Sequence, residues 1–185
     1  SASAIAESER TLRAQRFIAE ASVQPVASHD GLVDIEVRTR DNWSLKPGLN
    51  FSRSGGVNKY KIEIEESNFL GWGKNLQIEQ SSDVDRTSTL LSYEDPNLFG
   101  SRLRGKVVYA DSSDGTTEQL RIEQPFFALS TRHAGGFDLL DDRRTTDLYE
   151  LGHVSESFEQ KSRRGDVWLG LSRGLDVDVF APGLS

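Results

Sequence analysis

Three histidines, His29, His133 and His153, are the side chains best suited to bind a metal ion or to move a proton. No two of them lie four residues apart, the spacing that places two metal ligands on one face of a helix. The chain has no cysteine, so thiol catalysis and cysteine-ligated metals are excluded. The sequence therefore predicts no enzyme, and we expect no catalytic residue, no metal site and no cofactor.

Three short motifs carry weaker chemical signals. Residues 71–74 (GWGK) have some features of a phosphate-binding loop but lack its full spacing. Residues 111–115 (DSSDG) could hold calcium, yet Glu118 comes too soon to act as the distal ligand of an EF-hand. Residues 141–144 (DDRR) could contact lipopolysaccharide head groups through their arginines. We interpret all three segments as turns or solvated loops.

The overall composition excludes several classes of partner and of membrane protein. The chain has 185 residues and a formal net charge of -7 with both signs interspersed, so the basic stripe that nucleic acid requires is missing. No window holds the roughly 18 apolar residues that a membrane helix needs. A membrane β-barrel is not excluded, because only every second residue of its strands must be apolar. Without a signal peptide or a starting methionine, the sequence is expected to be a segment of a longer protein.

The first 42 residues predict a small α+β unit. Residues 7–15 are expected to be helical, and residues 16–23 and 32–39 are expected to be strands. Residues 28–31 (SHDG) supply a hairpin turn between the two strands. We therefore expect a helix followed by a β-hairpin.

From Trp43 onward the pattern predicts strand after strand. Several expected strands are about ten residues long, which fits a tilted membrane strand better than a strand of a soluble sheet. The expected strands are residues 44–54, 58–67, 75–84, 87–95, 102–111, 117–124, 131–140, 146–158 and 166–175.

Alternation within these strands separates two faces. Tyr60, Ile62 and Ile64 share one side of their strand, and lysines and glutamates occupy the other side. Residues 102–109 and 120–123 alternate in the same way. An apolar face opposite a face with charges of both signs fits a barrel with a wet lumen and a lipid exterior. It also fits any half-buried antiparallel sheet, so alternation alone leaves both interpretations open.

The turns alternate between two chemistries and favour the barrel. Residues 54–56, 82–85, 111–115 and 141–144 are polar, whereas residues 69–73, 96–100 and 125–129 carry large apolar side chains. In an up-and-down sheet alternate turns lie at the same end, so one end should be charged and the other aromatic. Aromatic residues gather in this way at the interfaces of membrane barrels. Residues 68–74 are also loosely repeated by residues 97–102.

Three of these segments resemble a known family. Residues 93–102 (YEDPNLFGSR) resemble the Tyr-x-Asp-Pro-x-Leu-x-Gly-x-Arg stretch of the BamA/TamA-like barrel superfamily, the bacterial surface antigens. Residues 68–73 (NFLGWG) resemble a turn of that family, and residues 123–126 (EQPF) resemble its strand that ends in Pro-Phe. The positions that carry the resemblance are Asn68, Gly71, Gly73, Tyr93, Asp95, Pro96, Leu98, Gly100, Arg102, Pro125 and Phe126.

The resemblance implies a mainly β fold in which an antiparallel up-and-down meander forms part of a transmembrane β-barrel. Residues 1–42 would be the C-terminal part of a POTRA-like periplasmic domain, and residues 43–185 would be about eight or nine strands from the N-terminal portion of the barrel. The implied location is the outer membrane of Gram-negative type. The implied role is to insert other barrel proteins into that membrane or to move passenger polypeptides across it. Partners would be outer-membrane lipid, unfolded barrel or passenger polypeptides, and periplasmic accessory proteins.

In this family the first barrel strand is an edge that opens and pairs with a client strand. Here that strand would be residues 44–54, and its unpaired backbone groups would bind a client by β-augmentation. Pro47, Gly48, Gly55 and Gly56 would weaken its own pairing. The residues assigned to this edge are Ser44, Leu45, Gly48, Leu49, Asn50 and Phe51.

Two other functions stay open. The chain could be a soluble all-β binding or structural module of the cell envelope, whose aromatic turns contact a partner. It could also be the barrel carrier of a fused, secreted domain. The family's Arg-Gly-centred loop inside the barrel would lie in the half that this sequence does not contain. Arg104-Gly105 and Arg173-Gly174 sit in strand-like settings and are not its counterparts.

Overall fold

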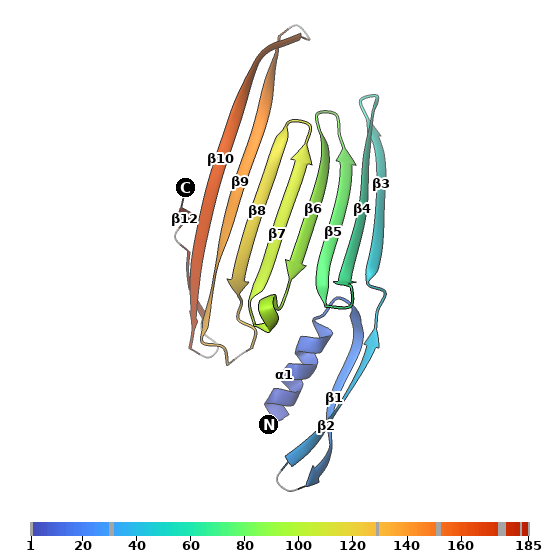
Figure 1. The fold of residues 1–185 in the computed structure, drawn as a ribbon, viewed down its shortest axis with the longest axis vertical. Helices are drawn as coiled ribbons and strands as arrows, with labels where there is room; N and C mark the ends of the chain where they lie inside the picture. Colours follow the sequence, from blue (N-terminus) through green and yellow to red (C-terminus); the bar gives the residue numbers. More distant parts are fainter. Residues whose placement is uncertain are drawn as a thin grey trace.

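The computed structural model describes residues 2–29, 32–128, 130–150, 153–173, 177–181 and 183–184. The chain forms a helix and a two-stranded sheet, followed by a sheet of ten strands (Figure 1). The first part comprises α1 (Ala2–Arg13), β1 (Ile18–His29) and β2 (Leu32–Asp41). The large sheet comprises β3 (Leu45–Ser54), β4 (Val57–Phe69), β5 (Lys74–Ser82), β6 (Thr87–Asp95), β7 (Arg104–Ser112), β8 (Gly115–Gln124), β9 (His133–Glu150), β10 (His153–Ser172), β11 (Val177–Phe180) and β12 (Gly183–Leu184), with a short 3-10 turn, η1 (Leu98–Gly100), between β6 and β7.

The large sheet is an antiparallel up-and-down meander, as the sequence predicts. Each strand from β3 to β11 pairs with the next one along the chain, and β12 pairs with β10 beside β11. Two short strands after β10 raise the number of strands above the eight or nine expected. Among the described residues the two edges of the sheet do not pair with each other, so the sheet is not closed, and β3 pairs with β4 alone.

The expected boundaries are wrong for β9 and β10. Residues 141–144 do not form a turn but lie inside β9, paired with both β8 and β10. The predicted strand of residues 146–158 therefore runs across the end of a long hairpin, whose tip, Leu151 and Gly152, lies outside the described residues. The charges are accommodated in the strand because neighbours pair with them: Asp142 accepts a hydrogen bond from Thr117 on β8 at 2.6 Å and pairs with Arg144, two residues along β9, at 2.8 Å.

The α1–β1–β2 unit has a small core of its own. Ala21 and Val23 on β1 are among the three buried hydrophobic residues of the described chain. Arg13 Nε donates to the Ala21 carbonyl at 3.0 Å, and the Val23 N–H donates to Glu9 at 3.2 Å, which tie α1 to β1. The helix begins at Ala2, earlier than predicted, and β1 extends beyond the predicted residue 23. The predicted Asp30-Gly31 turn falls outside the described residues.

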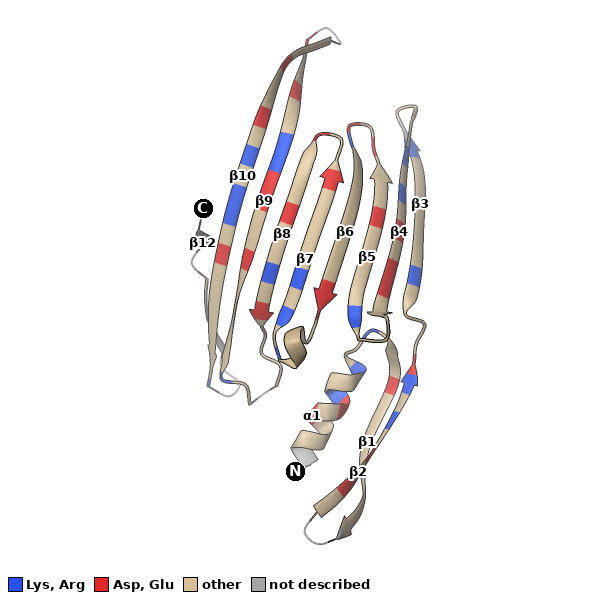
Figure 2. Ribbon diagram, in the orientation of Figure 1, with Lys and Arg blue, Asp and Glu red and all other residues tan. Residues whose placement is uncertain are grey.

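The large sheet has two faces of opposite character. We call the side that carries Leu49, Ile62, Val107, Leu120 and Leu139 the apolar face, and the register places these side chains on one side of the sheet. Leu49 is 67% exposed and Val107 is 50% exposed, since no other described element covers this face. The opposite side, which we call the charged face, carries side chains such as Lys61, Glu63 and Glu79. Lys and Arg are interspersed with Asp and Glu along the strands of the sheet (Figure 2).

The two ends of the sheet differ as the sequence predicts. The β3–β4, β5–β6 and β7–β8 turns lie together at one end, and the long β9–β10 hairpin projects beyond them (Figure 1). The β4–β5 turn, η1 and the β8–β9 connection lie at the other end, beside α1 and the β1–β2 hairpin. In the described part of the chain, no helix is both long enough and apolar enough to span a bilayer.

Candidate functional site: the edge strand and the apolar turns

Among the described residues, no strand pairs with the outward row of backbone groups of the edge strand β3. Its ten residues pair with β4 without a bulge, from Leu45 opposite Glu66 to Ser54 opposite Val57. The Ser44 carbonyl, one residue before β3, accepts the Ser67 N–H at 3.0 Å. Bonded and non-bonded positions alternate along an antiparallel ladder, so the even-numbered residues of β3 face β4. The N–H and C=O groups of Leu45, Leu49, Phe51 and Arg53 therefore face away from the sheet.

The position of Pro47 and the residues of the β3–β4 turn are both compatible with the pairing of β3 on one side only. Pro47 occupies one of the outward positions, so its missing N–H removes no hydrogen bond to β4, and proline is tolerated on such an edge. The two-residue turn uses Gly55 and Gly56 at φ values of 58° and 83°, which a tight hairpin requires and only glycine adopts readily. Gly48 lies on the charged face, where a Cβ atom would sit 3.4 Å from Glu63 Cβ, an ordinary contact.

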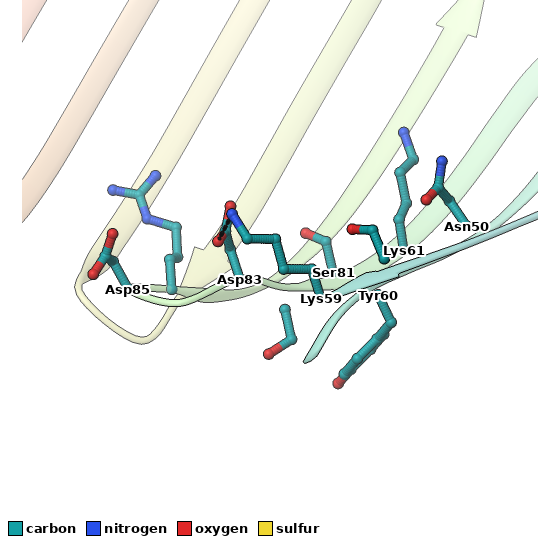
Figure 3. A pocket seen from close by; sticks show the side chains of 10 residues that line it. Asn50, Lys59, Tyr60, Lys61, Ser81, Asp83 and Asp85 are labelled. Atoms are coloured by element: carbon teal, nitrogen blue, oxygen red, sulfur yellow. Dashed lines mark ion pairs between the residues drawn. The ribbon is translucent and has the colours of Figure 1, made fainter. Parts of the chain in front are cut away.

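A shallow polar hollow lies on the charged face beside the edge strand. Asn50, Lys59, Lys61 and Asp83 point to this side of the sheet, whereas Tyr60 points to the other side (Figure 3). Lys59 pairs with Asp83 at 2.6 Å. The Lys59 ammonium, helped by the Val84 N–H, holds the pKa of Asp83 below its usual value. Strand β3 therefore borders the apolar face on one side of the sheet and the charged face on the other.

The charges of the charged face neutralise one another in networks. Glu63 and Glu79 lie opposite each other, and Lys61 bridges them at 3.0 and 2.9 Å. Farther along the sheet, Arg121 and Gln119 both bind Asp138. These networks stabilise a wet surface, and they do not form a reactive centre. No group of three potential metal ligands occurs among the described residues.

The two repeated apolar turns have the same backbone conformation. Leu70 and Phe99 both have a φ of 55°, the left-handed region, and each is followed by a glycine in the same region. The Gly71 N–H donates to the Asn68 carbonyl and the Gly100 N–H to the Asn97 carbonyl, both at 2.8 Å. The side chains held in this way are exposed, by 65% for Leu70 and 92% for Phe99. Bulky residues rarely adopt this conformation, and at both positions it holds an apolar side chain in an exposed place.

A buried ion pair links the two turns. Lys74, at the end of the first turn, contacts the Asp95 carboxylate at 2.5 Å, and their side chains are only 19% and 9% exposed. Asp95 also accepts the Asn97 N–H at 2.9 Å at the start of the second turn. Asn68 has a similar task in the first turn, where its side-chain oxygen accepts the Gly73 N–H at 2.8 Å.

Other motif residues pack around the same end of the sheet. Leu98 lies over Gly105, where a Cβ atom would sit 3.3 Å away. The Arg102 guanidinium stacks 3.9 Å above the Phe127 ring. Phe126 lies over Gly170, where a Cβ atom would come within 2.8 Å of its ring. The motif residues Leu98, Arg102 and Phe126 thus all pack at this end of the sheet.

The α1–β1–β2 unit contacts the first of these turns. The Phe17 ring lies against Gly73, with its carbons 3.4 Å from the position of a Cβ atom there. Arg16 forms an ion pair with Glu65 on β4. Within the unit itself, the Asn42 N–H donates to the Phe17 carbonyl at 2.8 Å. The orientation of the unit is therefore fixed by few contacts at one end of the large sheet.

One segment at the end of β10 matches the sequence pattern of an enzyme motif. Residues 170–174 have the Gly-x-Ser-x-Gly spacing of a hydrolase nucleophile elbow. Ser172 is the last residue of β10, it is buried, and its N–H donates to the Arg132 carbonyl at 2.9 Å. The next described element is the strand β11 and not a helix, so the surroundings are not those of an elbow.

The structure places the predicted site residues in two groups. Ser44, Leu45, Gly48, Leu49, Asn50 and Phe51 lie on or beside the sheet edge, and most motif residues lie in or beside the apolar turns. In the described part of the chain, the two groups come close together at the start of β3, where Ser44 of the edge bonds to Ser67, the neighbour of the motif residue Asn68. The left-handed residues Leu70 and Phe99 and the Lys74–Asp95 pair were not predicted. The repeat of a large apolar residue followed by glycine was the signal that could have identified the first two.

Replacement of Phe99 by glycine should have opposite effects on stability and membrane contact. Release of the left-handed strain should raise the free energy of unfolding by about 1 kcal/mol. Loss of the exposed ring should slow insertion into vesicles if the turn enters the interface. Denaturant unfolding in micelles and the rate of insertion measure the two effects, with Phe99→Tyr as the control that keeps both the left-handed side chain and the aromatic ring. A loss of stability in Phe99→Gly would contradict this account of the turn.

Comparison with known proteins supports the fold only. No protein-family model matches the sequence, and no curated protein matches it. Among solved structures, the chain is similar to the crystal structure of BamA from Haemophilus ducreyi lacking POTRA domains 1–3, with a TM-score of 0.50 and 18% sequence identity. The match covers 94% of this chain and 38% of that structure, so the chain spans less than half of its length. The fold thus resembles part of a BamA barrel.

Proposed function

We propose that the chain belongs to an outer-membrane factor that inserts barrel proteins into the membrane or moves polypeptides across it. Residues 43–185 would be the N-terminal portion of its barrel, and residues 1–42 would be the end of a POTRA-like periplasmic domain. The observation that carries the proposal is the edge strand β3, whose outward backbone groups border an exposed apolar face. Large exposed apolar surfaces mark interaction with lipid or protein. The resemblance to a BamA barrel supports the same proposal.

In the proposed mechanism, an unfolded client adds a strand to β3. Main-chain hydrogen bonds to the outward groups of Leu45, Leu49 and Phe51 supply the affinity, so the client needs no particular sequence. The apolar face contacts lipid and the charged face lines the aqueous interior. The α1–β1–β2 unit stands in the periplasm at the end of the sheet where client polypeptides arrive.

Membrane insertion is the first result that the proposal requires. After refolding into vesicles, the protein should give a compact gel band that slows only on boiling, together with β-rich circular dichroism. A chain that is monomeric and folded in plain buffer and indifferent to lipid would favour the soluble module instead. Insertion without any effect on client polypeptides would favour the carrier of a secreted domain.

Crosslinking then tests the edge itself, since the chain lacks cysteine and single thiols can be introduced cleanly. Ser52→Cys on the edge strand should form disulfides with cysteines placed in the end strand of an unfolded barrel precursor. The matched control is Ser81→Cys on β5, which lies on the same face but is paired on both sides. Equal yields from the two positions would argue against pairing at β3.

A further inference from the structure

The α1–β1–β2 unit and the edge strand each bring a cation to one carboxylate, that of Glu65 on β4. Lys46 on β3 lies directly opposite Glu65, and the register places both side chains on the charged face. The Cβ atoms of residues paired in this way lie about 5 Å apart, which is close enough for an ion pair. Arg16, in the connection between α1 and β1, forms an ion pair with the same carboxylate. Glu65 can therefore be bound from two parts of the chain, which meet at this end of the sheet (Figure 1).

Lys46 has no ion-pair partner among the described residues, although it lies opposite a carboxylate. Lys46 is exposed. The next carboxylate on the same side of β4, that of Glu63, is already bound by Lys61 and by Gln77, each at 3.0 Å. Opposite charges directly across an antiparallel ladder stabilise the pairing of the two strands. The start of β3 therefore lacks a contribution that its own sequence could supply through Glu65.

The α1–β1–β2 unit is held to the large sheet by contacts that can break without unfolding it. The Arg16 side chain is 60% exposed, and an ion pair with such an exposed partner contributes little to stability. The Phe17 ring touches the sheet at Gly73, in the first apolar turn. The unit has its own small core, and residues 42–44 separate its last strand from β3. The unit can therefore leave the sheet as one body while it stays joined to the edge strand.

We infer that Arg16 and Lys46 compete for Glu65, so that docking of the α1–β1–β2 unit loosens the start of the edge strand. With the unit docked, Arg16 binds Glu65 and Lys46 stays in water. With the unit released, Glu65 loses this cation, and a carboxylate that is only 20% exposed is costly to leave unpaired. Lys46 then pairs with it across the ladder and strengthens the start of β3.

The exchange couples the position of the unit to the strength of β3–β4 pairing. A docked unit goes with a loosely held strand start, and a released unit goes with a firmly held one. The purpose of this coupling rests on the proposed function, because it would regulate the strand to which a client adds. The coupling itself is a property of the chain alone and can be measured without a client.

Amide hydrogen exchange of the full chain, refolded in micelles and followed by NMR, tests the competition. The N–H groups of Lys46 and Gly48 face β4 and report how firmly the start of β3 is held. We expect Arg16→Gln to slow their exchange by about two- to fivefold, because Lys46 then pairs with Glu65. The direction of this effect is diagnostic. If Arg16 only supported the structure, loss of its ion pair would make exchange faster.

Two further variants complete the test. Arg40→Gln is the matched control, since it removes the same charge from the α1–β1–β2 unit, where Arg40 pairs with Glu20 and not with the sheet. It should leave the exchange rates unchanged. The double variant Arg16→Gln/Lys46→Gln removes both competitors and should exchange at least as fast as the parent.

Each outcome bears on the inference. Slower exchange in Arg16→Gln that is lost in the double variant supports it. Faster or unchanged exchange in Arg16→Gln would overturn it. Slower exchange that persists in the double variant would overturn it as well, because the effect would not depend on Lys46. A refolded chain without heat-modifiable mobility would contradict the proposed function, whereas intact mobility with unchanged exchange overturns this inference alone.

Discussion

Double replacement of Leu49 and Phe51 by proline is expected to lower client-strand pairing by about tenfold while the β3–β4 ladder stays intact. Both residues direct their N–H groups away from β4. The variant therefore removes two donors from the free edge and none from the sheet. Each lost backbone hydrogen bond is worth roughly 0.5–1.5 kcal/mol, which together give a decrease of about that size. The yield of client crosslinks at Ser52→Cys measures the effect.

Two control variants distinguish the effect of the lost N–H groups from the effect of the changed side chains. Leu49→Thr/Phe51→Thr changes the same side chains but keeps both N–H groups, so its crosslink yield should stay near that of the parent. Asn50→Pro removes an N–H that faces β4 and should weaken the sheet itself. If the double proline variant crosslinks as well as the parent, client strands do not bind this edge.

Asp95→Ala is expected to lower the free energy of unfolding by about 2–3 kcal/mol. The substitution leaves Lys74 largely buried without its partner and removes the acceptor of the Asn97 N–H. Breaking one side of a buried ion pair is costly because the remaining charge is uncompensated. Both apolar turns should loosen together, since this pair links them. The urea midpoint of the heat-modifiable band gives the measurement.

The double variant Asp95→Ala/Lys74→Met distinguishes charge from packing. It removes the stranded cation and should recover much of the lost stability. Asp85→Ala, in the exposed β5–β6 turn, should change stability by less than about 0.5 kcal/mol. An equal loss in Asp85→Ala and Asp95→Ala would refute the special role of the pair.

The sequence was sufficient to predict the meander, its two faces and its two kinds of turn. Each of these follows from local patterns: Tyr60, Ile62 and Ile64 alternate with charges, and Gly55-Gly56 favours a tight hairpin turn. The place of β3 at the sheet edge also agrees with the order of strands. Local sequence patterns do not reveal which strand pairs with this edge, so client-strand pairing stays a prediction.

The wrong predictions concern segments whose structure depends on contacts with other strands and not on their own composition. Four charged residues in a row, 141–144, suggest a loop because a strand with two polar faces is unusual in a short sheet. Here Asp141 pairs with Arg163 on the next strand, a partner 22 residues away that no local pattern reveals. The Lys74–Asp95 pair was missed for the same reason. The early start of α1 is a different case, because three of residues 2–6 are alanine, the residue with the highest helix propensity, and the prediction gave them too little weight.

Pro47 has a consequence for the purified protein in solution. Two molecules that meet edge to edge would each bring this proline into the shared ladder, and the join would lack a donor from both sides. A foreign strand need not carry a proline of its own, so its ladder with β3 lacks only the single donor missing at Pro47. The residue therefore discourages growth of fibres from identical copies while it leaves heterologous pairing open. In concentrated stocks, Pro47 should protect colloidal stability.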